Sequence, residues 1–343
     1  MVDSSKLFLF CCCYRSNEPP PPLNSLKLFF QVYKMSVDCS NEAGTSRCAS
    51  CGVAENDEVK LKKCNGCYLV RYCGVECQKA HRKQHKKECK KRATELREEL
   101  LFKQPEINDF GDCPICMLPI PIDMEKPIVI YSCCGKVICK GCYYATQILG
   151  GELKPGQTCP FCRELLPKGS EEKQKHFEQK MMKRVEANDP VAMREEGMAQ
   201  YGKGNYIRAF ECHVQAAELG DAEAHYQLAL MFYHGIGVEK DEGKEIYHLE
   251  EAAIGGNSSA RHRLGCEEWS NDNFERAVRH WTIAAAQGLD KSMKILMDVF
   301  QGGLVSKEVL AATRRAHQAA VDSMKSPQRE AAKELERMRD NSL

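Results

Sequence analysis

Cysteines are the residues of this chain whose spacing could support chemistry. Twenty-one occur in 343 residues, and most form pairs separated by two or three residues within residues 48–162. Beyond residue 162 only Cys212 and Cys266 occur. Two thiolates at C-x2-C spacing have the bite that a zinc ion needs, whereas disulfide frameworks belong to small, secreted, loop-rich chains. The pattern therefore predicts zinc sites in an intracellular protein of the cytoplasm or nucleus.

The first cysteine cluster offers four pairs of side chains that can bind metal. They are Cys48, Cys51, Cys64, Cys67, Cys73, Cys77, His85 and Cys89. These ligands suffice for two tetrahedral zinc ions, and sites closed by four protein ligands are structural rather than catalytic. Because so short a segment cannot build a large apolar core, zinc binding should contribute directly to its folding free energy.

The segment Tyr72–His81, YCGVECQKAH, resembles the MYND finger family. The resemblance implies interleaved pairs, with Cys48, Cys51, Cys73 and Cys77 around one zinc ion and Cys64, Cys67, His85 and Cys89 around the other. His81 is then a residue of the helix surface rather than a ligand. Family members bind proline-rich peptides near this helix, which makes such peptides expected partners. Arg82 departs from the family, which often has Trp at that position.

The second cluster has RING-like spacing: Cys113-x2-Cys116, sixteen residues, Cys133-Cys134, Cys139-x2-Cys142, sixteen residues, Cys159-x2-Cys162. The cross-brace of that family implies one zinc ion at Cys113, Cys116, Cys139 and Cys142. Cys159 and Cys162 would hold the second with two ligands from the middle. The usual Cys-x-His reads Cys134-Gly135-Lys136 here, and a protonated lysine cannot bind a metal. We therefore expect the adjacent Cys133 to supply the missing thiolate.

Many RING domains recruit a ubiquitin-conjugating enzyme, and the resemblance implies which residues would do so here. Ile115 and Pro160 match the apolar contact positions, and Arg163 matches a cation that hydrogen-bonds both ubiquitin and the enzyme. No Trp lies between Cys142 and Cys159, and its place could be taken by Tyr143, Tyr144 or Ile148. Two hypotheses remain: a RING-type ubiquitin ligase, and a noncatalytic protein-interaction scaffold, which Lys136 favours.

Downstream of the cysteines, the chain repeats. Three segments end alike, in AAELG, AAIGG and AAAQG, and their last glycines (Gly220, Gly256 and Gly288) are 36 and then 32 residues apart. Each unit reads as a helix, a Gly-rich or polar turn, a second helix and a glycine stop, which indicates an α-solenoid. Residues 189–323 resemble the Sel1-like repeats of the tetratricopeptide class, most clearly from Ala224 to Gly256. The resemblance implies a concave protein-binding surface.

The sequence thus predicts a multidomain chain in which small zinc-stabilised α+β modules precede an all-α solenoid of helix-turn-helix repeats. The expected parts are a disordered extension (1–45), the MYND-type finger (48–89), a charged helical linker (90–107), the RING-like domain (113–163), a second charged helical linker (168–186), the repeats (189–323) and a charged C-terminal helix or tail (324–343). Met35 is a plausible true start.

Composition excludes several functional classes. The net charge is only +1 with 28% charged residues, so nucleic acid is not an expected partner and proteins are. No run reaches the roughly 18 apolar residues of a membrane span. No phosphate-binding loop, serine nucleophile elbow or catalytic carboxylate pair occurs. An enzymatic role would therefore be limited to the RING-like domain.

Overall fold

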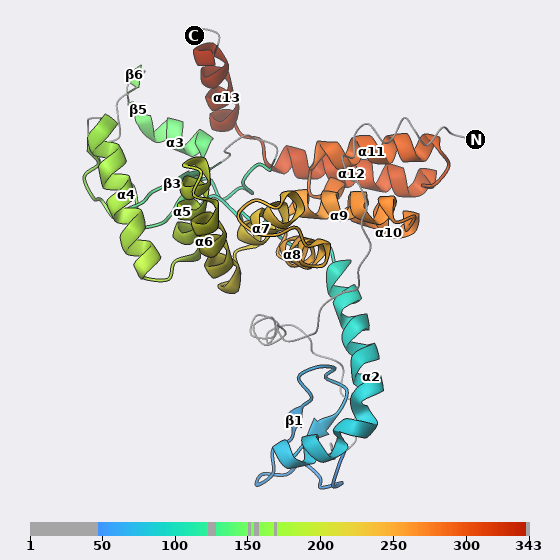
Figure 1. Ribbon diagram of the computed structural model, residues 1–343. Coiled ribbons are helices and arrows are strands. Elements are labelled where there is room, and N and C mark those ends of the chain that lie inside the picture. The colour runs from blue at the N-terminus through green and yellow to red at the C-terminus, as the bar shows by residue number, and fades with distance from the viewer. Residues whose placement is uncertain (1–46, 123–127, 150–151, 154–157, 168–169, 341–343) are drawn as a thin grey trace. The chain divides into compact units, whose positions relative to one another are not determined.

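The fold is known from a computed structural model that describes residues 47–122, 128–149, 152–153, 158–167 and 170–340. The extension predicted over residues 1–45 and the start at Met35 lie outside these residues. The chain divides into two compact units, of which one contains residues 47–103 and the other residues 104–340 of the described part (Figure 1). Each unit is described below by itself.

The first unit contains the first cysteine cluster, a short hairpin and one long helix. Strands β1 (Lys62–Lys63) and β2 (Arg71–Tyr72) pair antiparallel, with Lys62 opposite Tyr72. Helix α2 runs without a break over Val75–Leu101. The helix that carries His85 and Cys89 therefore continues without a break through residues 90–101 of the predicted linker (90–107) and ends before Pro105. Its high content of Lys, Arg and Glu supports helix formation beyond the cysteines.

The second unit begins with the second cysteine cluster. Strands β3 (Ile128–Ile130) and β4 (Val137–Cys139) form an antiparallel hairpin, and α3 (Lys140–Gln147) follows directly. Strands β5 (Ile148–Leu149) and β6 (Glu152–Leu153) make a second, very short hairpin. Helix α4 (Ser170–Glu186) then leads to the repeats. Around the cysteines, Ile120, Tyr131 and Ile138 form a small core.

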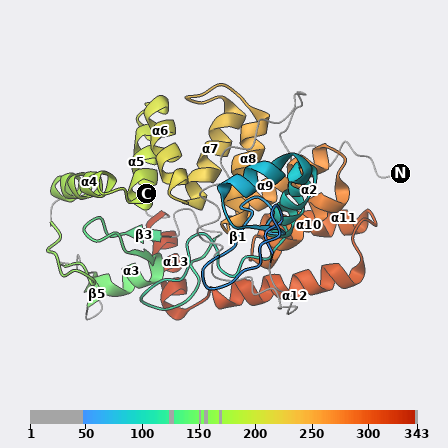
Figure 2. The ribbon, with the colours of Figure 1, turned by 90° about the horizontal axis from the view of Figure 1, so that it is seen from below.

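The repeats are successive antiparallel helix pairs, visible in Figures 1 and 2. They consist of α5 (Pro190–Gly202), α6 (Tyr206–Glu218), α7 (Ala222–His234), α8 (Glu242–Ile254), α9 (Ser258–Ser270), α10 (Phe274–Ala286), α11 (Asp290–Gln301) and α12 (Lys307–Ser323). Asp189, Asp221 and Asn257 cap α5, α7 and α9, and each accepts a hydrogen bond from the N–H of the alanine three residues later. This shared cap fixes where the first helix of each repeat begins.

The paired alanines and the terminal glycines of the repeats have the roles expected from the sequence. Ala216, Ala252 and Ala284 are completely buried, so neighbouring helices approach closely at these positions. Gly220, Gly256 and Gly288 have φ values of 90°, 96° and 100°, a left-handed conformation that suits glycine and ends the second helix of each repeat. These observations confirm the predicted solenoid.

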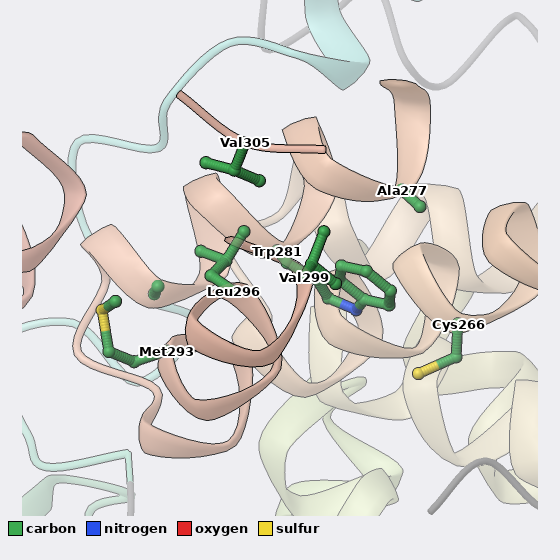
Figure 3. Packing of buried hydrophobic residues seen from close by; sticks show 8 residues of the cluster. Cys266, Ala277, Trp281, Met293, Leu296, Val299 and Val305 are labelled. Carbon is green, nitrogen blue, oxygen red and sulfur yellow. The ribbon is translucent and has the colours of Figure 1, made fainter. Parts of the chain in front are cut away.

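The largest core of the repeats surrounds Trp281, which is only 1% exposed (Figure 3). Its indole packs with Leu296 and Val299 of α11 and with Cys266 of α9. Helix α13 (Pro327–Asp340) follows the repeats and packs on α3 of the second cysteine module. Among the described residues, no helix combines the length and apolar character needed to cross a membrane.

Candidate metal centres

The sixteen side chains predicted as metal ligands gather in four groups of four, with the ligand atoms of each group within 4.8 Å of one another. The first three groups are Cys48, Cys51, Cys73 and Cys77; Cys64, Cys67, His85 and Cys89; and Cys113, Cys116, Cys139 and Cys142. The fourth is Cys133, Cys134, Cys159 and Cys162. These groups have the same interleaved membership that the sequence predicted.

Sulfur separations within the groups suit zinc and not disulfides. Thiolates about 2.3 Å from one zinc ion, at tetrahedral angles, lie about 3.8 Å apart, whereas a disulfide bond measures about 2.05 Å. Here the Sγ atoms of Cys64 and Cys89 are 3.8 Å apart, those of Cys116 and Cys139 3.9 Å, and those of Cys134 and Cys159 3.6 Å. The cysteines of the described part are all free thiols. Their arrangement is compatible with zinc binding.

Four of the five C-x2-C segments share one backbone conformation, in which the residue after the second cysteine is left-handed; the fifth, Cys139–Cys142, lies at the end of β4 and the start of α3. Gly52, Tyr68, Met117 and Arg163 have φ values of 76°, 59°, 55° and 61°. Each donates its N–H to the carbonyl of the first cysteine of its pair, at 2.8 to 3.0 Å. A positive φ is uncommon for residues other than glycine. Its recurrence in both clusters indicates that the RING-like segments are knuckles of the same kind as those of the first cluster.

The knuckles that begin at Cys48 and Cys113 favour the thiolate form of these cysteines. Burial raises the pKa of the Cys48 thiol, but hydrogen bonds from the N–H groups of Cys51, Cys73 and Ser50 outweigh it and lower that pKa to about 6. Burial likewise raises the pKa of the Cys113 thiol, but hydrogen bonds from the N–H groups of Cys116, Cys139 and Ile115 outweigh it and lower that pKa to about 7. A thiolate is the form that binds a metal ion, so the backbone prepares both positions for a cation.

His85 is the only histidine in the four groups. Its Nε2 lies 3.2 Å from the Sγ of Cys67, and its ring is buried. His81, one turn earlier on α2, stands outside the groups: its Nδ1 hydrogen-bonds the Tyr72 hydroxyl at 3.0 Å, and its ring stacks on that of His85 at 5.7 Å. His81 therefore supports the position of a ligand and is not gathered with the ligands.

Cys133 and Cys134 lie together at the tip of the β3–β4 hairpin. The turn is closed by the N–H of Gly135 donating to the Tyr131 carbonyl at 2.7 Å. It places the Sγ of Cys133 3.4 Å from Cys162 and that of Cys134 3.6 Å from Cys159. Lys136, at the position where the RING family has a histidine, is exposed and outside the group. Adjacent cysteines thus occupy both middle positions.

Helix α4 contacts the knuckle of the fourth group through Glu164. This carboxylate lies 2.5 Å from Lys180 Nζ and 3.0 Å from His176 Nε2. The hydrogen bond from Lys180, followed by that from His176, lowers the pKa of Glu164. The charged segment that the sequence predicted as a linker is therefore docked on the second cysteine module.

The three residues that the sequence assigned to a ubiquitin-conjugating enzyme are exposed. Ile115 is 40% exposed although it is an apolar residue between two cysteines, and Pro160 and Arg163 are exposed on the other knuckle. With the residues that the structure describes, the Arg163 side chain forms no hydrogen bond or ion pair, and the carboxylate of the neighbouring Glu164 pairs with α4. Tyr144, one of the residues expected to take the place of the missing Trp, lies near α13, and its hydroxyl is 3.5 Å from the Glu336 carboxylate.

Histidines of the repeats form contacts that the sequence did not reveal. His225 and His248 meet with their Nδ1 atoms 2.9 Å apart, and burial is the main cause that lowers the pKa of His248 to about 3. His213 and His280 are buried, and burial lowers their pKa values to about 4 and about 3. In the described part these histidines join no group of three or more metal-binding side chains. Burial thus keeps His213, His248 and His280 neutral near pH 7.

Comparisons with known proteins identify two of the three modules. The MYND finger model matches residues 39–89, and the Sel1 repeat model matches residues 193–221, 222–257 and 259–289. Both resemblances drawn from the sequence are therefore confirmed, and the chain carries two kinds of module that mediate protein interactions. Neither match covers residues 113–163. None of the curated proteins compared matches the chain.

Two solved structures are each similar to about half of this chain. A Sel1 repeat protein from Oxalobacter formigenes is 23% identical, with a TM-score of 0.37 over 52% of this chain and 70% of that one. The protein c5321, a protective antigen of uropathogenic Escherichia coli with an SLR fold, is 20% identical, with a TM-score of 0.34 over 49% of this chain and 36% of that one.

Proposed function

We propose that this zinc-binding interaction protein is a RING-type ubiquitin ligase that holds four zinc ions, two in the MYND finger and two in residues 113–163. The observation that carries the proposal is the pair of knuckles in the second module. They have the backbone of the MYND knuckles, yet they present Ile115, Pro160 and Arg163 to solvent. Ile115 is 40% exposed although it is apolar, so its side chain is available to a partner.

Each exposed residue has a chemical role in the proposed contact. Ile115 and Pro160 would bury apolar surface against the conjugating enzyme, and each Å² removed from water contributes about 25 cal/mol. Arg163 carries a planar guanidinium whose fork of N–H donors can bridge two partners at once. Its left-handed backbone, with a φ of 61°, fixes where that fork leaves the knuckle.

The module would act by positioning and not by covalent catalysis. Its eight cysteines all belong to the third and fourth groups, so none is left as a nucleophile for ubiquitin transfer. The RING-like surface would hold the ubiquitin thioester of the conjugating enzyme in a reactive conformation, which raises the rate by restricting orientation. Zinc, when bound, would supply no chemistry beyond holding the two knuckles in place.

The other modules would select what is modified. The repeats supply a protein-binding surface, and the MYND finger exposes apolar side chains on its second knuckle, among them Leu69 at 61%. Proline-rich peptides are the partners proposed for the finger. Arg82 is exposed on α2, the helix that also carries His85 and Cys89, which favours peptides that combine prolines with acidic residues.

The test is ubiquitin transfer by the purified full chain, shown by native mass spectrometry to hold its zinc, with a panel of conjugating enzymes. Self-modification should occur with at least one enzyme, and Ile115→Ala and Arg163→Ala should each reduce its rate at least tenfold. Leu69→Ala is the matched control, because it truncates an exposed apolar side chain on a knuckle of the other zinc module and should leave the rate unchanged. No transfer with any enzyme would contradict the proposal.

A noncatalytic scaffold is the second candidate, and Lys136 favours it. This exposed cation replaces the histidine ligand of the RING family, and no Trp lies between Cys142 and Cys159. If the scaffold description holds, the zinc-loaded chain transfers no ubiquitin but the second module still binds proteins. Capture of partners that depends on Ile115, in the absence of transfer, would distinguish the scaffold from the ligase.

A further inference from the structure

Arg329, in the first turn of α13, is buried against the second cysteine module and is only 3% exposed. A guanidinium has five N–H donors, and here every one has an acceptor. Nε donates to Cys139 Sγ at 3.4 Å; Nη2 donates to Cys116 Sγ at 3.3 Å and to the Leu118 carbonyl at 3.1 Å; Nη1 donates to the carbonyls of Pro119 at 2.6 Å and Met324 at 2.7 Å.

The two sulfurs that accept from Arg329 belong to the third group of predicted zinc ligands. Four thiolates outweigh the charge of one divalent ion, so a zinc-loaded group of this kind is negative. A buried arginine is costly unless an anion compensates it, and the described surroundings of Arg329 offer these thiolates and neutral carbonyls. The charge of the metal centre and the charge of the arginine therefore balance each other.

The chain is shaped to let α13 approach this closely. A Cβ at Gly141, in the first turn of α3, would lie 2.7 Å from Cγ and 2.8 Å from Cα of Arg329, so any larger residue would push the helix away. Further along α13, Glu336 forms an ion pair with Lys140 at 2.7 Å. Both Figure 1 and Figure 2 show α13 beside α3. The contact between α13 and the module thus runs from the buried Arg329 to the Glu336–Lys140 ion pair.

We propose that Arg329 is a positioning residue of the third metal group and that α13 docks on the module only while zinc is bound there. Hydrogen bonds to the thiolates of Cys116 and Cys139 hold these ligands in place and slow zinc loss. Without zinc, no shared cation holds Cys116 and Cys139 together, so the two sulfurs are no longer fixed where the buried guanidinium needs its acceptors. Because the Met324 carbonyl at the end of α12 also binds Arg329, zinc loss would uncouple the repeats from the module at this point.

This inference rests on the zinc occupancy proposed above, and its test distinguishes a failure of that occupancy from a failure of the role given to Arg329. Zinc release from the full chain is followed with a chromophoric chelator, and Cys113→Ser identifies the phase that belongs to the third group by losing it. Absence of such a phase in the wild type would refute the proposed occupancy itself. If the phase exists, Arg329→Ala should speed it about 10- to 100-fold, because loss of a hydrogen-bond partner of a metal ligand typically lowers metal affinity by about that factor. Arg337→Ala is the matched control, because Arg337 lies on the same helix, is exposed and pairs with Glu334.

Docking of α13 is measured separately, by trypsin cleavage after Lys325, which lies in the exposed turn before the helix, and by hydrogen exchange of residues 327–338. Chelation of the wild type should raise both the cleavage rate and the exchange rate. In zinc-loaded Arg329→Lys these rates should lie between those of the zinc-loaded and the chelated wild type, because an ammonium keeps the charge but cannot reach all five acceptors. The wild type and Arg329→Lys, each loaded with Co²⁺, should also differ in the charge-transfer band from thiolate to metal.

Two outcomes would overturn the inference. If Arg329→Ala frees α13 but leaves the release phase and the cobalt spectrum unchanged, the arginine only docks the helix. If α13 stays protected after the third group has lost its metal, docking does not depend on zinc. Glu336→Gln is a control for a general loss of packing, because it weakens the ion pair with Lys140 and leaves the hydrogen bonds to the thiolates. It should therefore raise the hydrogen exchange of α13, but its zinc release should stay slower than that of Arg329→Ala.

Discussion

The carboxylate of Asp109 accepts a hydrogen bond of 2.6 Å from the side-chain amide of Asn257, the residue that caps α9. The same amide donates to Glu223 at 2.8 Å, so two carboxylates share one amide. Burial is the main cause that raises the pKa of Asp109 to about 6 and that of Glu223 to about 7, and the charge of Asp109 contributes to the second shift. The segment before the second cysteine module is thereby fastened to the repeats.

This arrangement makes the stability of the repeats depend on pH. An acid whose pKa is higher in the folded state stabilises that state while it is protonated, and this contribution is lost as the pH rises through the folded pKa. Asp109→Asn is permanently neutral and keeps an oxygen for Asn257. It should therefore raise the free energy of unfolding at pH 8 by on the order of 1–2 kcal/mol relative to the wild type, and by much less at pH 4.5.

The measurement is chemical denaturation followed by tryptophan fluorescence, because both tryptophans of the chain, Trp269 and Trp281, lie in the repeats. The buried histidines titrate in the opposite direction, since their lowered pKa values favour the folded state as the pH rises, but they are common to both proteins and cancel in the difference. An equal effect of Asp109→Asn at both pH values would contradict the assignment.

Helix packing in the repeats should be sensitive to one methyl group at Gly265. A Cβ there would lie 2.4 Å from the Trp281 Nε1, which donates to the His262 carbonyl at 3.2 Å. Gly265→Ala should lower the free energy of unfolding by about 1–3 kcal/mol through overpacking, despite the better helix propensity of alanine. Gly202→Ala, at a helical glycine with no atom within 4 Å of its Cβ, should instead be neutral or stabilising by up to about 1 kcal/mol.

Zinc content should report the role of the adjacent cysteines. We expect native mass spectrometry to find four zinc ions in the wild type and three in Cys133→Ser and in Cys134→Ser, because a tetrahedral site that loses a thiolate is left open. Cys212→Ala serves as the control, since Cys212 is a buried cysteine of α6 that joins none of the four groups. Four ions in both serine variants would show that neither residue is needed as the fourth ligand.

Spacing in the sequence predicted much of this architecture because local constraints determine it. Four of the five C-x2-C pairs take the same compact knuckle conformation, and the alanines and glycines of the repeats mark close helix packing and helix ends at fixed positions. Cys133 could be assigned because Lys136 left a ligand missing. That these residues bind zinc stays a prediction, although the structure gathers them as expected.

Contacts between distant segments could not be read in the same way. In the sequence, Arg329 is one of many charged residues of a helical tail. No adjacent residue indicates that Cys116 and Cys139 accept hydrogen bonds from its guanidinium. The same holds for Asp109 and for the pair His225 and His248, each of which depends on how helices pack in three dimensions. Helix α2 was divided in the prediction because the metal ligands and the charged run were considered separately, whereas the backbone continues through both.

Metal removal should separate the parts of the chain that depend on zinc from those that do not. With excess chelator and reductant present, residues 47–101 and 113–163 should lose hydrogen-exchange protection, because they have little core apart from their cysteines. Helices α5 to α12 are held by their own alanine contacts and by the Trp281 core, so the free energy of unfolding reported by tryptophan should change by less than about 1 kcal/mol. Circular dichroism should show that most helix remains. If tryptophan fluorescence instead reported unfolding as the metal left, the repeats would depend on the zinc modules for their stability, through contacts such as that of Asp109 with Asn257.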